Sequence, residues 1–360
     1  MRIIKLNEQS RANILADLLK RDPNNYSAYE GTVQEIVDDV RARGDEALFE
    51  YTKKFDGAEL SADNIRVTQA EIQEALSQVD PNLLAVMKKS MKNIREYHEK
   101  QKQYSWFDSK PNGTILGQKV TALSSVGVYV PGGKAAYPSS VLMNIIPAEV
   151  AGVEKIVMVT PPGKDGRVNP VTLIAAHLAG ATEVYKVGGA QAIAALAFGT
   201  KSIPRVNKIV GPGNIFVALA KKAVYGHVSI DSIAGPSEIL VLADENANPR
   251  YVAADLLSQA EHDELASAIL VTTSVPDLRS TVPVALNFID APMQKNHTAR
   301  MGTVPVIIPL VNDPKYFPAP GEKVWHSTPR NSGTSIIPPG IFSIERFICI
   351  SITCRHIFKG

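Results

Sequence analysis

Apolar residues recur every three or four positions through the first hundred residues, which is the spacing of an amphipathic helix. One such run begins at Val33 and overlaps the capping-box pattern Thr32–Glu35, which predicts that a helix starts at Thr32. Gly44 interrupts this pattern, a second helical pattern follows, and a longer amphipathic helix is expected over residues 82–101. The amino-terminal region is therefore predicted to be mostly helical.

From residue 115 the pattern changes to short apolar runs that end in glycine or proline. Helical patterns separate several of these runs, among them one that ends at Phe198, one that ends at Val224 and one over Pro249–Glu264. Strands that alternate with helices predict a parallel α/β sheet, and such sheets bind ligands beyond the carboxyl ends of their strands. The expected strands are residues 126–130, 155–160, 183–187, 208–210, 238–243 and 268–272.

Glycine-rich turns follow two of these strands and lead directly into helices. They are Gly188-Gly189 and Gly211-Pro212-Gly213-Asn214. Such a turn lets backbone N–H groups approach a phosphate, although neither matches the dinucleotide fingerprint G-x-G-x-x-G. Two interpretations remain open on these residues alone: a nucleotide site, or glycines that only make tight turns.

Two polar side chains stand close together near the end of the last predicted helix. Gln259 and His262 are three residues apart, so their side chains share a helix face. A lone Gln and His near a helix end are usually solvated surface groups, and the helix dipole favours His there. A shared metal ion is the alternative.

The composition is that of a soluble globular protein with enough length for about two domains: 360 residues, 45% hydrophobic, 21% charged, net charge +2. This charge gives no reason to expect nucleic acid as a partner. No run of about 18 apolar residues predicts a membrane span, and residues 1–19 lack the apolar core of a signal peptide. A cytoplasmic protein is therefore expected.

The two cysteines, Cys349 and Cys354, form no disulfide framework, and with His356 they have a weak spacing for zinc.

The composition changes near Ser274. Residues 275–360 hold 11 of the 24 prolines and both cysteines, and helical periodicity is hard to find there. Three interpretations compete: a loop-rich domain, a disordered extension, or the product of a shifted reading frame. Disorder would come with fewer apolar residues than the run 342–350 offers.

Several motifs stand together before this boundary. They are Arg43-Gly44-Asp45-Glu46-Ala47-Leu48, Lys54-Phe55-Asp56-Gly57, Tyr129-Val130-Pro131-Gly132-Gly133, Val187-Gly188-Gly189-Ala190-Gln191-Ala192, Gly211-Pro212-Gly213-Asn214, Ile230-Asp231-Ser232-Ile233-Ala234-Gly235-Pro236-Ser237-Glu238 and Gln259-Ala260-Glu261-His262. With these motifs the sequence resembles the histidinol dehydrogenase family over roughly residues 1–273. The resemblance implies oxidation of L-histidinol to L-histidine with two NAD, at the end of histidine biosynthesis, by zinc-containing homodimers.

The resemblance assigns three residues to the NAD site by position: Tyr129, Gln191 and Asn214 match the family's NAD contacts. The alternative for Tyr129 is an ordinary buried aromatic of a strand. The alternative for Asn214 is a turn residue that tolerates a left-handed backbone.

The resemblance also implies a substrate and zinc site. Ser237 matches a substrate contact, although a helix cap or turn hydroxyl is its simpler interpretation. Gln259 and His262 match two zinc ligands that also border the substrate. The family takes its other zinc ligands and a proton-accepting Glu-His pair from later in the chain.

The expected fold is α/β, with two incomplete Rossmann-like parallel-sheet domains of aldehyde-dehydrogenase-like architecture and a helical amino-terminal region. Residues 1–24 form an amino-terminal arm, residues 25–108 with 238–273 a first domain on the zinc and substrate side, and residues 109–237 a second domain on the NAD side. Residues 274–360 form an irregular tail outside the family pattern.

Whether the chain is expected to be active depends on the catalytic residues that the family takes from the region of the tail. No Glu-His dipeptide occurs after Ser274, so the catalytic residues are unknown and the zinc shell is incomplete. The abrupt end of the resemblance favours a shifted reading frame. Three outcomes are carried forward: an impaired histidinol dehydrogenase, a catalytically inactive NAD-binding fragment, and a product without a stable fold.

Overall fold

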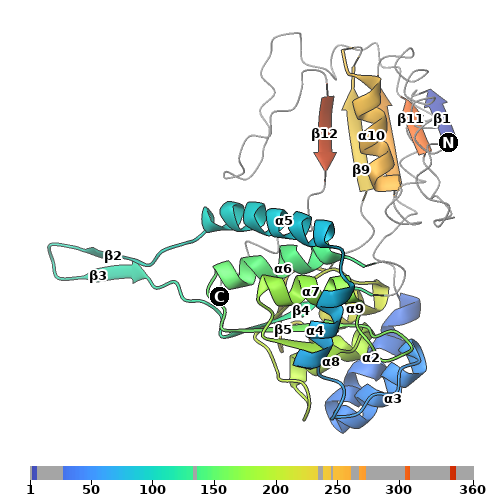
Figure 1. The fold of residues 1–360 in the computed structure, drawn as a ribbon. Coiled ribbons are helices and arrows are strands. Elements are labelled where there is room, and N and C mark those ends of the chain that lie inside the picture. The colour runs from blue at the N-terminus through green and yellow to red at the C-terminus, as the bar shows by residue number, and fades with distance from the viewer. Residues whose placement is uncertain are drawn as a thin grey trace. The chain divides into compact units, whose positions relative to one another are not determined.

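A computed structural model describes residues 2–5, 27–132, 136–233, 238–244, 246–260, 267–272, 305–308 and 341–345 (Figure 1). The chain divides into two compact units. The larger unit comprises Asn25–Gly235 with Phe347–Gly360, and the smaller unit comprises Met1–Asn24 with Pro236–Arg346. The domain that was expected to join residues 25–108 to 238–273 stays a prediction.

A five-stranded parallel sheet forms the centre of the larger unit. Its order is β6-β5-β4-β7-β8, so the chain starts in the middle, builds outward to one edge, and then returns to build the other. This is the order of a doubly wound nucleotide-binding sheet. The strands are β4 Ser125–Tyr129, β5 Lys155–Thr160, β6 Glu183–Lys186, β7 Lys208–Val210 and β8 Ser229–Ile230.

Both faces of this sheet are buried. Alternate residues of each strand point to opposite faces, so Val128 belongs to one apolar cluster and Tyr129 to the other. Helices α8 and α9 cover the Tyr129 face and pack against α2, whereas α6 and α7 cover the Val128 face and pack against α4 and α5 (Figure 1). The helix bounds are α2 Ser27–Arg43, α3 Asp45–Asp56, α4 Gln69–Gln78, α5 Pro81–Glu99, α6 Pro138–Val150, α7 Pro170–Ala179, α8 Gly189–Phe198 and α9 Ile215–Val224.

The predicted helix start at Thr32 is wrong. Helix α2 begins at Ser27, so Thr32 lies in its second turn. A true capping box occurs at α4, where the Thr68 hydroxyl accepts from the Glu71 N–H and the Glu71 carboxylate accepts from the Thr68 N–H. The two patterns look alike in sequence, and only the backbone around them separates a cap from a helix interior.

A two-stranded antiparallel hairpin projects from the larger unit (Figure 1). Strand β2 is Trp106–Ser109 and strand β3 is Ile115–Gln118, and the side chains of both are exposed. Cross-strand register places Trp106 and Leu116 on one face, with Phe107 and Ile115 on the other. The ribbon therefore carries apolar side chains on both of its faces.

The smaller unit contains a second α/β element. Strand β9 (Glu238–Ala243) pairs in parallel with β10 (Ser267–Thr272), and helix α10 (Pro249–Ala260) packs against both. The residues expected to form an irregular tail contribute two short strands. Strand β12 (Ile341–Glu345) pairs antiparallel with β9, and β11 (Pro305–Ile308) pairs in parallel with β1 (Arg2–Lys5).

These strands and helices confirm the predicted α/β class. All six expected strands are present, with bounds that differ by one residue at most. Among the described residues, no helix combines the length and apolarity that a membrane crossing requires.

Candidate functional site

The sheet order places the switch point of the topology at the carboxyl ends of β4 and β7. These neighbouring strands are where the chain changes direction, because the connection after β4 leads to one side of the sheet and the connection after β7 leads to the other. A doubly wound sheet binds its ligand at this switch point. Tyr129 is the last residue of β4, and Gly211 directly follows β7.

The turns at this edge pack against one another through glycine. A Cβ at Gly211 would stand 2.1 Å from the Tyr129 carbonyl oxygen, and one at Gly188 would stand 2.4 Å from Pro161 Cγ. A Cβ at Gly132 would lie 3.2 Å from the Pro161 carbonyl oxygen. The turns after β4, β5, β6 and β7 therefore meet at one edge, and the glycines are required there by close approach.

The Tyr129 phenol ties β4 to the start of helix α8. Its hydroxyl oxygen accepts a hydrogen bond of 3.2 Å from the Gly189 N–H. Burial raises the pKa of Tyr129 to about 12, and the nearby charge of Asp56 adds to the shift. The phenol therefore stays protonated, and its O–H remains a donor at neutral pH.

Gln191 lies in the first turn of α8 and is 1% exposed. Neither its Nε2 nor its Oε1 has a hydrogen-bond partner in the described parts of the chain. Its side chain folds over Gly189, where a Cβ would stand 2.6 Å from Gln191 Oε1. A buried primary amide with both atoms unpaired is costly, so this is the strongest local indication of a ligand site.

Asn214 is the N-cap of helix α9, and its Oδ1 accepts a bond of 3.2 Å from the Val217 N–H. The cap accounts for one of its side-chain atoms, and its backbone is extended (φ −68°, ψ 179°) rather than the left-handed turn that the sequence left open. The predicted NAD contacts Tyr129, Gln191 and Asn214 all lie at the carboxyl edge of one sheet. Their binding role stays a prediction.

A buried ion pair that the sequence analysis missed holds the turn before Asn214. Asp231 Oδ2 accepts from the Gly211 N–H at 2.8 Å, and Lys221 Nζ donates to the Gly211 carbonyl oxygen at 3.0 Å. Lys221 and Asp231 also pair directly with each other, and both side chains are buried. The turn is therefore held by two charged side chains, which satisfy the N–H and the carbonyl oxygen of Gly211. Asp231 belongs to the quoted motif that starts at Ile230, which was the available signal.

Asp56, the last residue of helix α3, is a second group that the sequence analysis did not single out. Its Oδ2 is buried and has no hydrogen-bond partner within the described ranges. Burial raises the pKa of this carboxyl to about 6. The motif Lys54-Phe55-Asp56-Gly57 contained the residue, but no sequence pattern shows that a carboxylate lacks a partner.

A family model described as histidinol dehydrogenase matches residues 19–302, which is most of the chain and extends past the boundary near Ser274. The chain belongs to the histidinol dehydrogenase family.

Curated histidinol dehydrogenases align closely with part of the chain. The protein of Halalkalibacterium halodurans is 60% identical over 257 residues, that of Clostridium acetobutylicum 62% over 243 residues, and that of Bacillus subtilis 60% over 256 residues. These alignments cover 71%, 68% and 71% of this chain. The matched region spans 60%, 56% and 59% of those relatives, so it is well short of their full length.

A solved structure has the same fold. The crystal structure of histidinol dehydrogenase from Elizabethkingia anophelis aligns with a TM-score of 0.78 and 36% identity, covering 88% of this chain and 72% of that one. The α/β architecture is thus that of a histidinol dehydrogenase.

The predicted zinc and substrate residues are described only in part. Gln259 lies in helix α10 of the smaller unit, and its buried Nε2 has no hydrogen-bond partner among the residues that the structure describes. Ser237 and His262 lie outside the described residues. Within the described ranges, no three His, Cys, Asp or Glu side chains are grouped closely enough to hold a metal ion. An unpaired buried amide at Gln259 fits a ligand site, and zinc stays a prediction.

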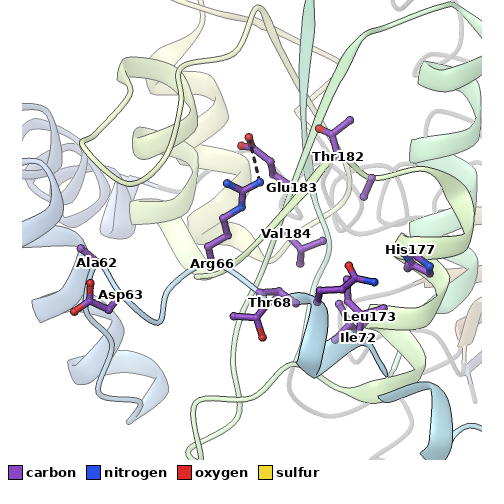
Figure 2. Close-up of a pocket in the computed structure, with 13 residues that line it drawn as sticks. Ala62, Asp63, Arg66, Thr68, Ile72, Leu173, His177, Thr182, Glu183 and Val184 are labelled. Carbon is purple, nitrogen blue, oxygen red and sulfur yellow. Dashed lines mark ion pairs between the residues drawn. The ribbon is translucent and has the colours of Figure 1, made fainter. Parts of the chain in front are cut away.

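A separate hollow of about 510 Å³ opens beside the amino-terminal end of β6 (Figure 2). Arg66 and Glu183 form an ion pair of 3.6 Å at this hollow, and His177 also lines it. None of the predicted site residues lines it. It lies at the end of the strand opposite to the glycine turns, so it is not the candidate site.

Proposed function

We propose that this chain is a histidinol dehydrogenase by descent and that its larger unit binds NAD at the carboxyl edge of the five-stranded sheet. The observation that carries this proposal is Gln191, whose buried amide has no hydrogen-bond partner among the described residues at the edge where four turns converge. An amide donor and acceptor, a phenol and a helix N-terminus are suited to the polar groups of a dinucleotide.

The proposed reaction is the oxidation of L-histidinol to L-histidine, the last steps of histidine biosynthesis. The alcohol loses two electrons and two protons to give an aldehyde, and the hydrated aldehyde loses two more electrons and two more protons to give the acid. NAD accepts a hydride in each of these two oxidations. The part assigned to Tyr129, Gln191 and Asn214 is to bind and orient the dinucleotide, because correct orientation of reactants accounts for much of an enzyme's rate.

Zinc is proposed for the smaller unit, held by Gln259 and His262, with Ser237 at the substrate. A zinc ion there would act as a Lewis acid that orients the imidazole and amine of histidinol. Two ligands from one helix give weak binding, because zinc is normally held by three or four protein ligands. Metal analysis after dialysis should give less than one zinc per chain, and Gln259→Ala should lower that content further. Equal zinc content in the variant would remove Gln259 from the site.

Turnover by this chain is proposed to be impaired. The tail after Ser274 contains no Glu-His dipeptide to accept the alcohol proton. A missing general base costs on the order of 10²- to 10⁴-fold in rate. Reading the other two frames of the encoding DNA downstream of codon 274 should reveal the missing pair if the reading frame has shifted, and finding no such segment would favour a genuine tail.

The direct test measures NAD binding and turnover on the same preparation. Calorimetry should detect NAD binding by the purified chain, and Gln191→Ala should weaken it about tenfold because two hydrogen-bonding atoms are lost. Gln73→Ala, which removes an exposed amide on helix α4, should leave the affinity unchanged. Absence of NAD binding by the unmodified chain would overturn the proposal.

The second candidate function is an inactive NAD-binding fragment. The turnover measurement distinguishes it from an impaired enzyme. NAD binding with no NADH formed from L-histidinol supports the fragment, whereas NADH formation supports the impaired enzyme.

A homodimer in the cytoplasm is proposed as the working state. The exposed hairpin of β2 and β3 supports an interface, because apolar side chains on both faces of a free ribbon are unusual in a monomer. Sedimentation should show a dimer that Phe107→Ser together with Leu116→Ser converts to monomer. A monomer in the unmodified chain would contradict this part.

A further inference from the structure

Asp56 is a carboxylate in a position that disfavours negative charge. It is the last residue of helix α3, where the helix dipole is negative. Its Oδ2 is buried without a hydrogen-bond partner in the described parts of the chain. A charge that is disfavoured both by the dipole and by burial points to a partner outside the described residues of this unit.

The surroundings of Asp56 place it at the carboxyl edge of the sheet. Gly57, the C-cap that follows helix α3, has a left-handed φ of 70°, and a Cβ there would lie 3.7 Å from Lys164 Cγ in the loop that follows β5. Burial is the main cause of the raised pKa of the Tyr129 phenol, and the charge of Asp56 adds to it. Asp56 therefore lies beside the loop after β5, at the same edge of the sheet as the proposed NAD contacts.

The unsatisfied groups at this edge complement one another. Gln191 offers an amide donor and acceptor with no partner in the described parts of the chain, and the Tyr129 hydroxyl still has its own O–H to donate after accepting from Gly189. Asp56 when ionised can only accept. The ligand that completes this set must therefore present hydrogen-bond donors to Asp56, and a ribose diol does so with two adjacent hydroxyls.

We propose that Asp56 accepts a hydrogen bond from the adenosine ribose of NAD and thereby selects NAD over NADP. A 2′-phosphate in place of that hydroxyl would remove the donor and set a second negative group against the carboxylate. Carboxylates select NAD in dinucleotide-binding sheets by this same chemistry, although there the acidic residue comes from the sheet itself. Here it comes from a helix that precedes the sheet in the chain. The inference rests on the proposed NAD site.

The test compares NAD and NADP affinities by calorimetry at pH 8, where the carboxyl is ionised. Asp56→Asn keeps the size of the side chain and removes the charge. It should weaken NAD binding about tenfold and reduce the preference for NAD over NADP by at least tenfold. Asp63→Asn is the matched control, since Asp63 is an exposed carboxylate in the segment that follows α3, and both affinities should stay unchanged.

A second measurement distinguishes a ligand role from a structural one. If the partner of Asp56 is the ribose, the NAD-free Asp56→Asn chain should unfold at a higher temperature than the unmodified chain at pH 8. A lower temperature would mean that the carboxylate pairs within the protein, and would overturn the inference.

The failures of the two proposals are separable. An unmodified chain that binds no NAD defeats the proposed function. An unmodified chain that binds NAD, with an Asp56→Asn variant that has the same NAD affinity and the same preference over NADP, defeats only the role of Asp56.

Discussion

At the residue scale, the buried carboxyl of Asp56 should lower the free energy of unfolding of the ligand-free chain. This effect depends on pH. Its pKa of about 6 lies above the ordinary 3.8 of an aspartate. Between these values the folded chain binds a proton that the unfolded chain does not, so the stability contributed by Asp56 falls as pH rises from about 4 to 6.

Asp56→Asn does not titrate, so it should be more stable than the unmodified chain at pH 8 and equal to it near pH 4. The full shift corresponds to about 3 kcal/mol, and partial exposure of the side chain reduces the expected gain to roughly 1 kcal/mol. Urea denaturation at both pH values checks this. A stability difference that does not change between pH 4 and pH 8 would contradict it.

Substitution of Gly211 should destabilise the chain, because no space is left for a side chain at this position. Its φ of 115° disfavours any side chain, and a Cβ would stand 2.1 Å from a backbone oxygen of Tyr129. Gly211→Ala should cost more than about 3 kcal/mol, because the clash is with backbone rather than with a flexible side chain.

The matched control for Gly211 is Gly31, which lies inside helix α2 with nothing within 4 Å of the position that a methyl group would take. Gly31→Ala should stabilise the chain by about 0.5–1 kcal/mol, since alanine favours the helix. Thermal melts of the two variants should therefore move in opposite directions, and a destabilised Gly31→Ala would show that helix α2 is packed differently.

At the scale of elements, helix α9 depends on one buried ion pair. Lys221→Met leaves Asp231 buried with only its backbone partners, and breaking a buried pair on one side costs about 3–5 kcal/mol. Its neighbour on the same helix, Lys222, forms an exposed pair of 2.8 Å with Glu30, so Lys222→Met should cost less than about 1 kcal/mol. Denaturant titration of the two variants provides the comparison, and equal losses would contradict the structural role of the buried pair.

The elements themselves were largely predictable from local pattern. Strands such as Lys155–Thr160 are continuous runs of β-branched and other apolar residues, because both faces of a parallel strand are buried. Helix starts were less predictable, since Ser27 begins α2 with no sequence signal stronger than the false one at Thr32. The strand order depends on pairings between distant residues, which no local pattern encodes.

For the candidate site, the glycine turns indicated only the edge of the sheet. Tyr129, Gln191 and Asn214 were assigned by the family resemblance, and their binding role stays a prediction. Asp56 and Lys221 matter because of the groups that surround their charges. Those groups come from segments far away in the chain, so no local pattern reveals them.

At the scale of the whole molecule, the two units differ in how much core their described residues form. The two large apolar clusters on the faces of the five-stranded sheet are drawn entirely from residues 25–235. The described cluster of the smaller unit is limited to eight buried residues of β9, β10, α10 and the turn before α10. A domain's stability depends mainly on the apolar surface that it buries, so the larger unit should be the more stable one.

A fragment of residues 25–235 should therefore fold without the rest of the chain. It should unfold in one cooperative transition, at a temperature within about 5 °C of the main transition of the full chain, because its apolar clusters remain intact. Calorimetry on the fragment and on the full chain gives both temperatures. The same fragment carrying Gly211→Ala should lose the transition or unfold more than about 5 °C lower. This control shows whether the transition reports folding of the sheet rather than non-specific collapse of the chain. A fragment with no cooperative transition would mean that the sheet depends on residues outside 25–235, and the stability of the larger unit would then have to be assigned to both units together.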